Sequence, residues 1–271
     1  MKKFTLFSLV MLSAALAFTS CSKELDPGQV RTKEVAVSLA TRLPSAPQSR
    51  AVTEQVADIE GYHLRYILEI WTSGDKPELY KRIVKEADAD KTTSFDVTLL
   101  SGRTFDFLLW ADYAEDGGNE DMHYTTVNGL KEVSRSEKTY ITDEQHDYGL
   151  AATRDAFSAH KQVTADAPIN ETITLTRAVA QLNIFTTDYD QLEESFRPAY
   201  TGLTITTAVD FNVLSGTSFG SATSDLRSYV AVKTEKEGTA PDKNKVFTGY
   251  YFTSSEGKNV VDMDVHFYRA D

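Results

Sequence analysis

Cysteine is nearly absent from this chain of 271 residues, in which Cys21 is the only example. A single cysteine cannot form a disulfide within the chain, so the fold must be stabilised by burial of apolar residues, which make up 41% of the sequence. The five histidines show no HExxH spacing, and neither a GxSxG motif nor a glycine-rich phosphate loop occurs. We therefore expect a protein that is not an enzyme and that uses no cofactor.

Positive charge is also scarce, because 28 Lys and Arg residues stand against 40 Asp and Glu residues and the formal net charge is -12. A nucleic-acid-binding surface needs an excess of basic side chains, so we expect no nucleic-acid partner. The acidic stretch 112–123 does not follow the EF-hand pattern, because Ala114 and His123 stand where that pattern requires ligands. The acidic cluster at 143–147 is interpreted as a solvated turn, and we expect no metal site.

The N-terminal end of the chain has the layout of a lipoprotein signal. Lys2 and Lys3 are followed by an apolar run at 4–18 and then by small polar residues that end at Cys21. The run is shorter than the roughly 20 apolar residues that a membrane-spanning helix needs. We predict a signal peptide at 1–20 and lipidation of Cys21, palmitate included. An ordinary secretory signal with a chance cysteine near the cut is the alternative.

Lipid on Cys21 would place the protein at the outer membrane, on the cell surface, and the segment that follows is predicted to be a tether. Residues 21–34 are polar and include a proline, Pro27, and a glycine. The remaining length is enough for two domains of roughly 100–150 residues each. We place the first domain at 35–168 and the second at 169–271, because a polar, irregular stretch ends there and a run of strands begins.

Alternation of apolar and polar residues with a period of two dominates the sequence after the tether and predicts an all-β protein made of sandwiches. Helix signals are limited to 189–196, and 79–87 is ambiguous between strand and helix. Ser101 and Gly102 are predicted to form the turn of a hairpin. The predicted strands span 35–39, 62–70, 95–99, 105–110, 172–176, 179–185, 203–209, 229–232, 246–252 and 260–268.

Three short blocks carry a resemblance to a known family: Asp106–Tyr113 (DFLLWADY), Arg154–Phe157 (RDAF) and Leu175–Ile184 (LTRAVAQLNI). In this order, behind a lipoprotein signal, they resemble the signature blocks of the fimbrillin-like lipoproteins of Bacteroidales, which include anchor and minor subunits of type V pili. The resemblance implies two transthyretin-like β-sandwich domains in tandem. It also implies a role in building or anchoring surface filaments, with other fimbrial subunits as partners.

The resemblance further implies polymerisation by strand exchange, in which the first strand is cut behind an arginine; anchors of the family keep this strand uncut. Arg42 and Arg50 lie on either side of a proline-containing loop after the first predicted strand, so they are candidate processing sites. Ordinary exposed arginines are the alternative. Relatives continue beyond the strand resembling 260–268, whereas this sequence stops at Asp271, so either the sequence is truncated or the second sandwich lacks a strand.

These observations predict a lipid-anchored fimbrial anchor, tip or minor subunit that works in cell adhesion by protein association. Asp155 and Arg177 are candidates for a partly buried interdomain pair. The alternative function is that of a monomeric surface lipoprotein that binds glycan or a host protein. Glycan binding would use exposed aromatic platforms, for which Tyr124, Tyr140 and Tyr148 are the candidates.

Overall fold

The computed structural model describes residues 33–44, 58–136, 152–185, 191–197, 200–229, 245–252 and 263–268. Among the features predicted above, Cys21, Arg50, Tyr140 and Tyr148 lie outside these residues. Within the described part of the chain, no helix has the length and the apolar character that crossing a membrane requires.

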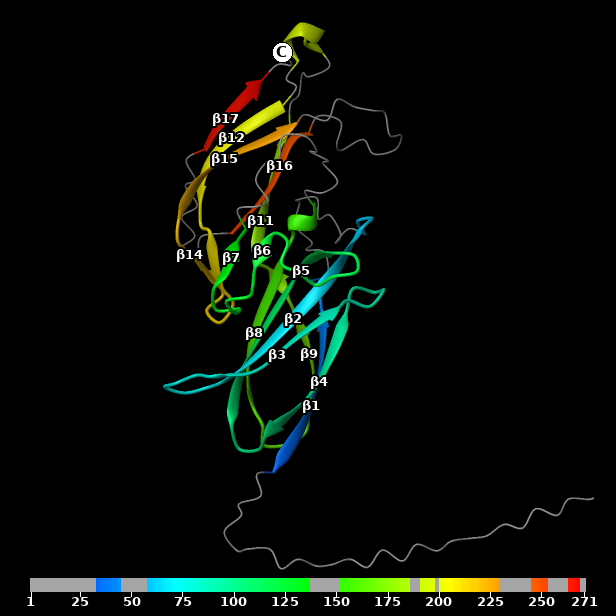
Figure 1. The fold of residues 1–271 in the computed structure, drawn as a ribbon, viewed down its shortest axis with the longest axis vertical. Helices are drawn as coiled ribbons and strands as arrows, with labels where there is room; N and C mark the ends of the chain where they lie inside the picture. The colour runs from blue at the N-terminus through cyan, green and yellow to red at the C-terminus, as the bar shows by residue number, and fades with distance from the viewer. Residues whose placement is uncertain are drawn as a thin grey trace, which may run out of the picture. The chain divides into compact units, whose positions relative to one another are not determined.

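The first sandwich consists of two layers of strands on either side of a core (Figure 1). In the three-stranded layer, the central strand β1 (Glu34–Arg42) pairs antiparallel with β4 (Thr93–Leu100) and parallel with β9 (Ile169–Thr174). The strands of the five-stranded layer are, in spatial order, β10 (Thr176–Arg177), β8 (Phe157–Thr164), β5 (Thr104–Glu115), β2 (Tyr62–Thr72) and β3 (Leu79–Glu86). The all-β prediction is confirmed.

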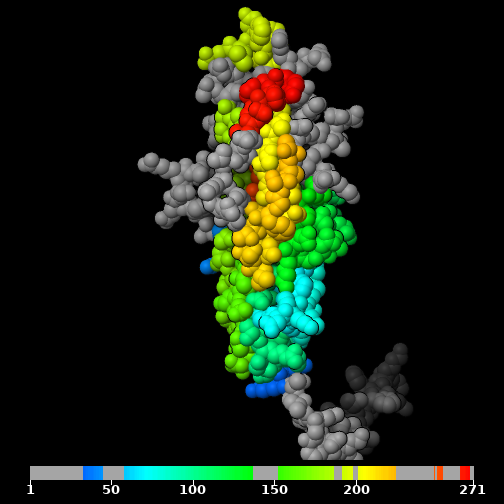
Figure 2. Space-filling view, turned by 90° about the vertical axis from the view of Figure 1, so that its left-hand side faces the viewer, coloured from blue at the N-terminus to red at the C-terminus, as the bar shows by residue number. Residues whose placement is uncertain are grey.

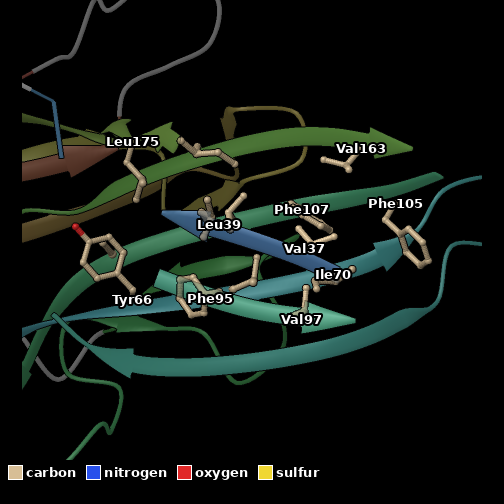
Figure 3. Packing of buried hydrophobic residues seen from close by; sticks show 14 of the residues in the cluster. Val37, Leu39, Tyr66, Ile70, Phe95, Val97, Phe105, Phe107, Val163 and Leu175 are labelled. Carbon is tan, nitrogen blue, oxygen red and sulfur yellow. The ribbon is translucent and has the colours of Figure 1, made fainter. Parts of the chain in front are cut away.

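Alternating apolar side chains of both layers fill the first core, as the period of two predicted. Val35, Val37 and Leu39 of β1 are at most 2% exposed, and Phe105 and Phe107 of β5 are fully buried. Figure 3 shows side chains of this core pointing into the space between the layers. Burial of one such side chain contributes roughly 1.5–3 kcal/mol, so the two layers are held together chiefly by this core.

The predicted hairpin between 95–99 and 105–110 is wrong. The two strands, β4 and β5, lie in different layers, because β4 pairs with β1 whereas β5 pairs with β2 and β8. The turn at Ser101 and Gly102, where Gly102 has a φ of 77°, carries the chain from one layer to the other. Alternation shows which side of a strand faces the core, but it does not identify the strand's partner.

The structure shows which conformation is adopted by the segment predicted as a helix, 189–196, in its described part, and by the ambiguous segment, 79–87. Residues 79–86 form the edge strand β3. In the described stretch 191–197, residues 192 and 193 are not helical and Glu194–Phe196 form a 3-10 turn, so the continuous two-turn helix predicted at 189–196 is wrong for these residues. A short helix depends on packing of an apolar face, and Phe196 is 57% exposed.

The second half of the chain forms a smaller sandwich. One layer consists of β11 (Val179–Phe185) and β16 (Lys245–Phe252), which pair antiparallel. The strands of the other layer are, in spatial order, β15 (Ala222–Tyr229), β12 (Tyr200–Thr207) and β17 (Met263–Tyr268). The buried core between them consists, among the described residues, of Leu203, Ile205, Phe247 and Tyr251. It is much smaller than the core of the first sandwich.

A four-stranded sheet links the middle of the chain to its second half. Its strands are, in spatial order, β14 (Thr217–Phe219), β13 (Asp210–Asn212), β7 (Val133–Arg135) and β6 (Tyr124–Thr125). The link is the pairing of β13 with β7, in which Phe211 lies opposite Val133. Both side chains are buried, so this sheet carries part of the apolar contact between the two halves.

The domain boundary predicted after residue 168 remains a prediction. The chain from Lys33 onward forms one compact unit. β9 begins at Ile169, directly after the predicted boundary, and pairs with β1 of the first sandwich. β10 then pairs with β8. The first sandwich therefore takes its last strands from residues that follow the predicted boundary.

Candidate functional site

Charged side chains are buried on the face of the five-stranded layer that points away from the first core. Arg65 of β2 and Asp112 of β5 are each 1% exposed. The Arg65 guanidinium donates from Nε to Asp112 Oδ1 at 2.6 Å and from Nη2 to Asp121 Oδ1 at 2.8 Å. We call residues 119–135 the covering segment. Because a charge is retained in a buried place only when it is paired, these bonds fasten the covering segment to the sheet.

Glu69 lies on the same face of β2 and fastens the covering segment at a second point. Its carboxylate accepts a hydrogen bond from the backbone N–H of Leu130 at 2.9 Å and one from Trp71 Nε1 at 3.0 Å, and it pairs with Arg82 of β3. Gly129, the residue before Leu130, has a φ of 102°, which glycine adopts without steric cost. The fully buried Glu69 is thus satisfied from three directions.

In both aspartates of this cluster, burial raises the pKa and hydrogen bonding lowers it, but the balance differs between the two. Loss of solvation raises the pKa of Asp112, and the neighbouring Arg65 charge offsets only part of that rise. Burial also acts to raise the pKa of Asp121, but hydrogen bonds from Thr126 and Arg65 outweigh it, so the pKa of Asp121 is lowered. Both carboxylates are engaged by Arg65, an arrangement that stabilises structure and presents no reactive group.

Trp110 of β5 lies in a second apolar core, which joins the covering segment to the second half of the chain. The centroid of its ring lies 5.4 Å from that of Tyr124, 6.0 Å from that of Phe211 and 6.5 Å from that of Phe252. Tyr124 is only 3% exposed. Its proposed role as an exposed platform for glycan is therefore wrong, because its ring faces are covered by other side chains.

Asp155 and Arg177, predicted to pair, lie side by side. Arg177 Nε donates to Asp155 Oδ2 at 3.0 Å, and Arg177 Nη2 lies 2.9 Å from the same oxygen. The guanidinium also lies 5.4 Å from the ring centroid of Phe157. Asp155 follows the 3-10 turn Ala152–Arg154 and Arg177 ends β10, so the pair ties these two stretches together. Its role as an interdomain contact remains a prediction.

Among the described strands, one layer of the second sandwich ends in β11 and β16 and the other in β15 and β17; we call the outer edges of β11 and β17 the open edges. On β17, Val265 packs against the small core, but Met263 and Phe267, which point to the same side, remain 43% and 53% exposed. Figure 2 shows β17 (red) at the surface beside β12 (yellow). A sheet edge next to a partly covered apolar face is a place where a further strand can be added.

Of the two arginines predicted as processing sites, the structure describes Arg42. Arg42 is the last residue of β1; its Nε donates to Thr174 Oγ1 at 2.8 Å, and its carbonyl accepts from the backbone N–H of Leu175 at 2.9 Å. Arg50 lies outside the described residues. The peptide bond after Arg42 is therefore held by the sheet on the side of β9.

A cleft with a volume of about 460 Å³ opens where β2 begins. It is formed by the turn before β2, the first residues of β2, the turn that follows β3, and Tyr113 of β5. Its charged lining residues are Asp58, Glu60, Asp88 and Lys91, and the lining also includes His63, whose Nδ1 lies 3.4 Å from Asp116 Oδ1. The volume falls within the range of about 300–1,000 Å³ that is usual for small-ligand sites.

His123 in the covering segment is buried as a neutral base. Its Nε2 lies 2.6 Å from Thr153 Oγ1, and its Nδ1 has no hydrogen-bond partner. Burial, aided by the positive charge of Arg154, lowers the pKa of His123 from 6.5 to about 3. Protonation of this imidazole would therefore require the covering segment to open.

Sequence reasoning missed the buried charges and the covering segment. The available signal was Arg65 and Glu69 standing in β2, a strand that is otherwise strongly apolar, with Asp112 ending the apolar run of β5. Charged residues at alternate positions normally indicate a solvated face. Here they mark a face that is covered by another part of the same chain.

Comparison with known proteins identifies a family and a shared fold. A family model described as a family of unknown function, DUF6562, matches residues 27–271. No curated protein matches the chain. A solved structure of a candidate adhesin from Bacteroides thetaiotaomicron is similar with 8% identity and a TM-score of 0.51, over 86% of this chain and 76% of that one. This likeness shows a shared fold.

Two further solved structures are similar over comparable lengths. A candidate polysaccharide-binding protein from Bacteroides thetaiotaomicron has 12% identity and a TM-score of 0.49, over 86% of this chain and 76% of that one. A candidate cell adhesion protein from Bacteroides eggerthii has 10% identity and a TM-score of 0.41, over 88% of this chain and 77% of that one.

Removal of Asp112 alone should destabilise the protein far more than removal of both partners. We expect Asp112→Ala to lower the free energy of unfolding by roughly 3–5 kcal/mol, because the buried Arg65 charge loses its fully buried partner and keeps only the partly exposed Asp121. Arg65→Met with Asp112→Leu should cost much less. Urea-induced unfolding measures both values. The control is Glu171→Ala, which breaks the exposed pair with Lys161 and should cost at most about 1 kcal/mol. Equal losses for the single and double variants would contradict this role.

Stability should fall with acid because of His123. Its folded-state pKa of about 3 lies below the unfolded value of 6.5, so between these values the unfolded chain binds a proton that the folded chain does not. The free energy of unfolding should then decrease by roughly 1.4 kcal/mol for each pH unit below about 6.5. His123→Gln should flatten this slope between about pH 6.5 and pH 4.5, whereas the exposed control His266→Gln should keep it. Equal slopes for the two variants would refute this assignment.

Proposed function

The chain belongs to the family of unknown function DUF6562, and from this premise we propose that it is a lipid-anchored protein of the outer-membrane surface. In this proposal Cys21 carries the lipid, residues 21–34 act as a tether, and the folded part serves as a fimbrial anchor, tip or minor subunit. Its activity is association with other subunits, and thereby adhesion.

The observation that carries this proposal is the pair of open edges in the second sandwich. Both β11 and β17 stand at the edge of their sheets among the described strands, beside apolar side chains that the small core does not fully cover. Added strands gain affinity from backbone hydrogen bonds and specificity from alternate side chains. A strand from a neighbouring subunit would both continue the sheet and cover Met263 and Phe267.

The strand that fits such an edge needs one apolar face and one face of small residues. β1 of this chain has that composition, since Val35, Val37 and Leu39 alternate with Ala36 and Ser38. In the structure β1 is occupied within its own sandwich, between β4 and β9. We therefore infer that the incoming strand comes from another subunit and resembles β1 in pattern.

Retention of β1 favours the role of an anchor over that of a stalk subunit. The strand is central in its layer, and Arg42 at its end is held through both its side chain and its carbonyl. A protease must draw an extended, accessible stretch of backbone into its active site, and such a strand is not available without unfolding. Of the two candidate processing sites, this disfavours Arg42 and leaves Arg50.

Digestion of the folded protein with an arginine-specific protease should separate the two sites. We expect a new N-terminus at Ala51 and none at Leu43, because Arg42 is held in the sheet. Mass spectrometry of the products provides the measurement. Arg50→Ala should remove the cut and Arg42→Ala should leave it unchanged, while the urea-unfolded chain should be cut at both positions. Appearance of Leu43 as N-terminus from folded protein would show that β1 is not protected.

Assembly should depend on the apolar side of β17. In cells that make their fimbriae, the wild-type protein should give a ladder on unboiled denaturing gels, with retention at the surface lost in Cys21→Ala. We expect Met263→Glu with Phe267→Glu to abolish the ladder, because two buried charges would oppose strand addition. The matched control is Asp264→Lys with His266→Glu, on the opposite side of the same strand.

A single monomer-sized band from the wild-type protein in these cells would refute the assembly proposal. The alternative of a monomeric surface lipoprotein that binds glycan or a host protein would then be preferred. Loss of the ladder in the control variant as well would show that β17 matters through its stability and not through its apolar side.

A further inference from the structure

We propose that the cleft at the start of β2 binds a basic side chain, guanidinium or ammonium, of a partner protein. The proposal does not depend on strand addition at the open edges, because none of the residues that line the cleft belongs to β11 or β17. It assigns a second contact, of a different chemical kind, to the first sandwich.

The walls of the cleft are fixed by backbone hydrogen bonds. Ala87 N–H donates to the carbonyl of Leu64 at 2.8 Å, and Tyr62 N–H donates to the carbonyl of Ile59 at 3.1 Å. On the far wall, the buried Tyr66 hydroxyl donates to the carbonyl of Lys91 at 2.6 Å. The cleft is therefore formed before a ligand arrives, which reduces the entropy lost on binding.

The charges of the cleft favour a cation. Asp58 pairs with Lys91 at 3.1 Å, so these two charges largely cancel each other. Glu60 and Asp88 also line the cleft, and neither makes an ion pair within the described part of the chain. A concave surface with an excess of one sign of charge concentrates ligands of the opposite sign, and it repels anions such as uronic or sialic acids.

The floor of the cleft suits the apolar part of a basic side chain. Leu64 and Tyr113 are 5% and 3% exposed, and both line the cleft together with the half-buried Tyr62. Lysine and arginine bury their methylene stems against apolar surface while the charged group stays at a polar rim. A cationic group over a tyrosine ring gains a further attraction. The combination of an apolar floor and two unpaired carboxylates distinguishes this cleft from an ordinary acidic surface.

The test is titration of the full chain, carrying Cys21→Ala for solubility, with the tripeptide acetyl-Gly-Arg-Gly-amide. Binding is followed by NMR chemical shifts of the cleft residues. We expect saturable shifts with millimolar affinity, and affinity that falls several-fold when salt is raised from about 50 to about 300 mM, since screening weakens exposed ion pairs. Glu60→Gln with Asp88→Asn should weaken binding by roughly fivefold or more.

The matched control is Asp75→Asn with Asp166→Asn, which removes two exposed carboxylates elsewhere and should leave the affinity unchanged. Acetyl-Gly-Gln-Gly-amide and maltotriose are the neutral probes. Equal binding of the glutamine peptide, preferential binding of maltotriose, or no shift with the arginine peptide would overturn the proposal. Unfolding midpoints of both double variants confirm that they fold. None of these outcomes bears on the ladder experiment, so the two proposals can fail separately.

Discussion

Burial of β2 and β5 on both faces is the constraint on which the rest of the structure depends. One face of these strands fills the first core, and the other carries Arg65, Glu69 and Trp110, none of which is more than 1% exposed. A sheet that is buried on both sides needs a second cover, and the covering segment supplies it. The same segment contributes β6 and β7, through which the second half of the chain is attached. The two halves are thereby joined through a shared apolar core as well as through the chain itself.

The two sandwiches differ in how completely their strands are satisfied. In the first, β1 has partners on both edges and its apolar side chains are fully covered. In the second, β11 and β17 each have one open edge among the described strands, and Phe267 stays half exposed on the inward side. A closed sandwich supports the fold. In an incompletely closed one, apolar side chains at the edge are still exposed, so their burial can stabilise association with another chain.

Sequence patterns predicted where the strands lie, but not how they pair. Alternation placed β1, β2 and β11 almost correctly, because one buried face imposes a period of two. It could not show that β4 and β5 belong to different layers, since pairing depends on residues distant in sequence. The charged residues of β2 indicated a solvated face, and only the fold shows that the covering segment lies over them. The cleft was equally hidden, because its walls come from three separate stretches of chain.

The parallel pairing of β1 with β9 has a consequence for the order of events during folding. Arg42 and Thr174, at the end of this pairing, are 132 residues apart in the sequence. A chain made from its N-terminus therefore completes β1 long before the partner that closes one of its edges exists. In the interval this apolar strand has an exposed edge, and contacts between distant residues form slowly. The nascent chain is thus most exposed to misassembly before residue 174 emerges, and a strand-binding chaperone would have its greatest effect in that interval.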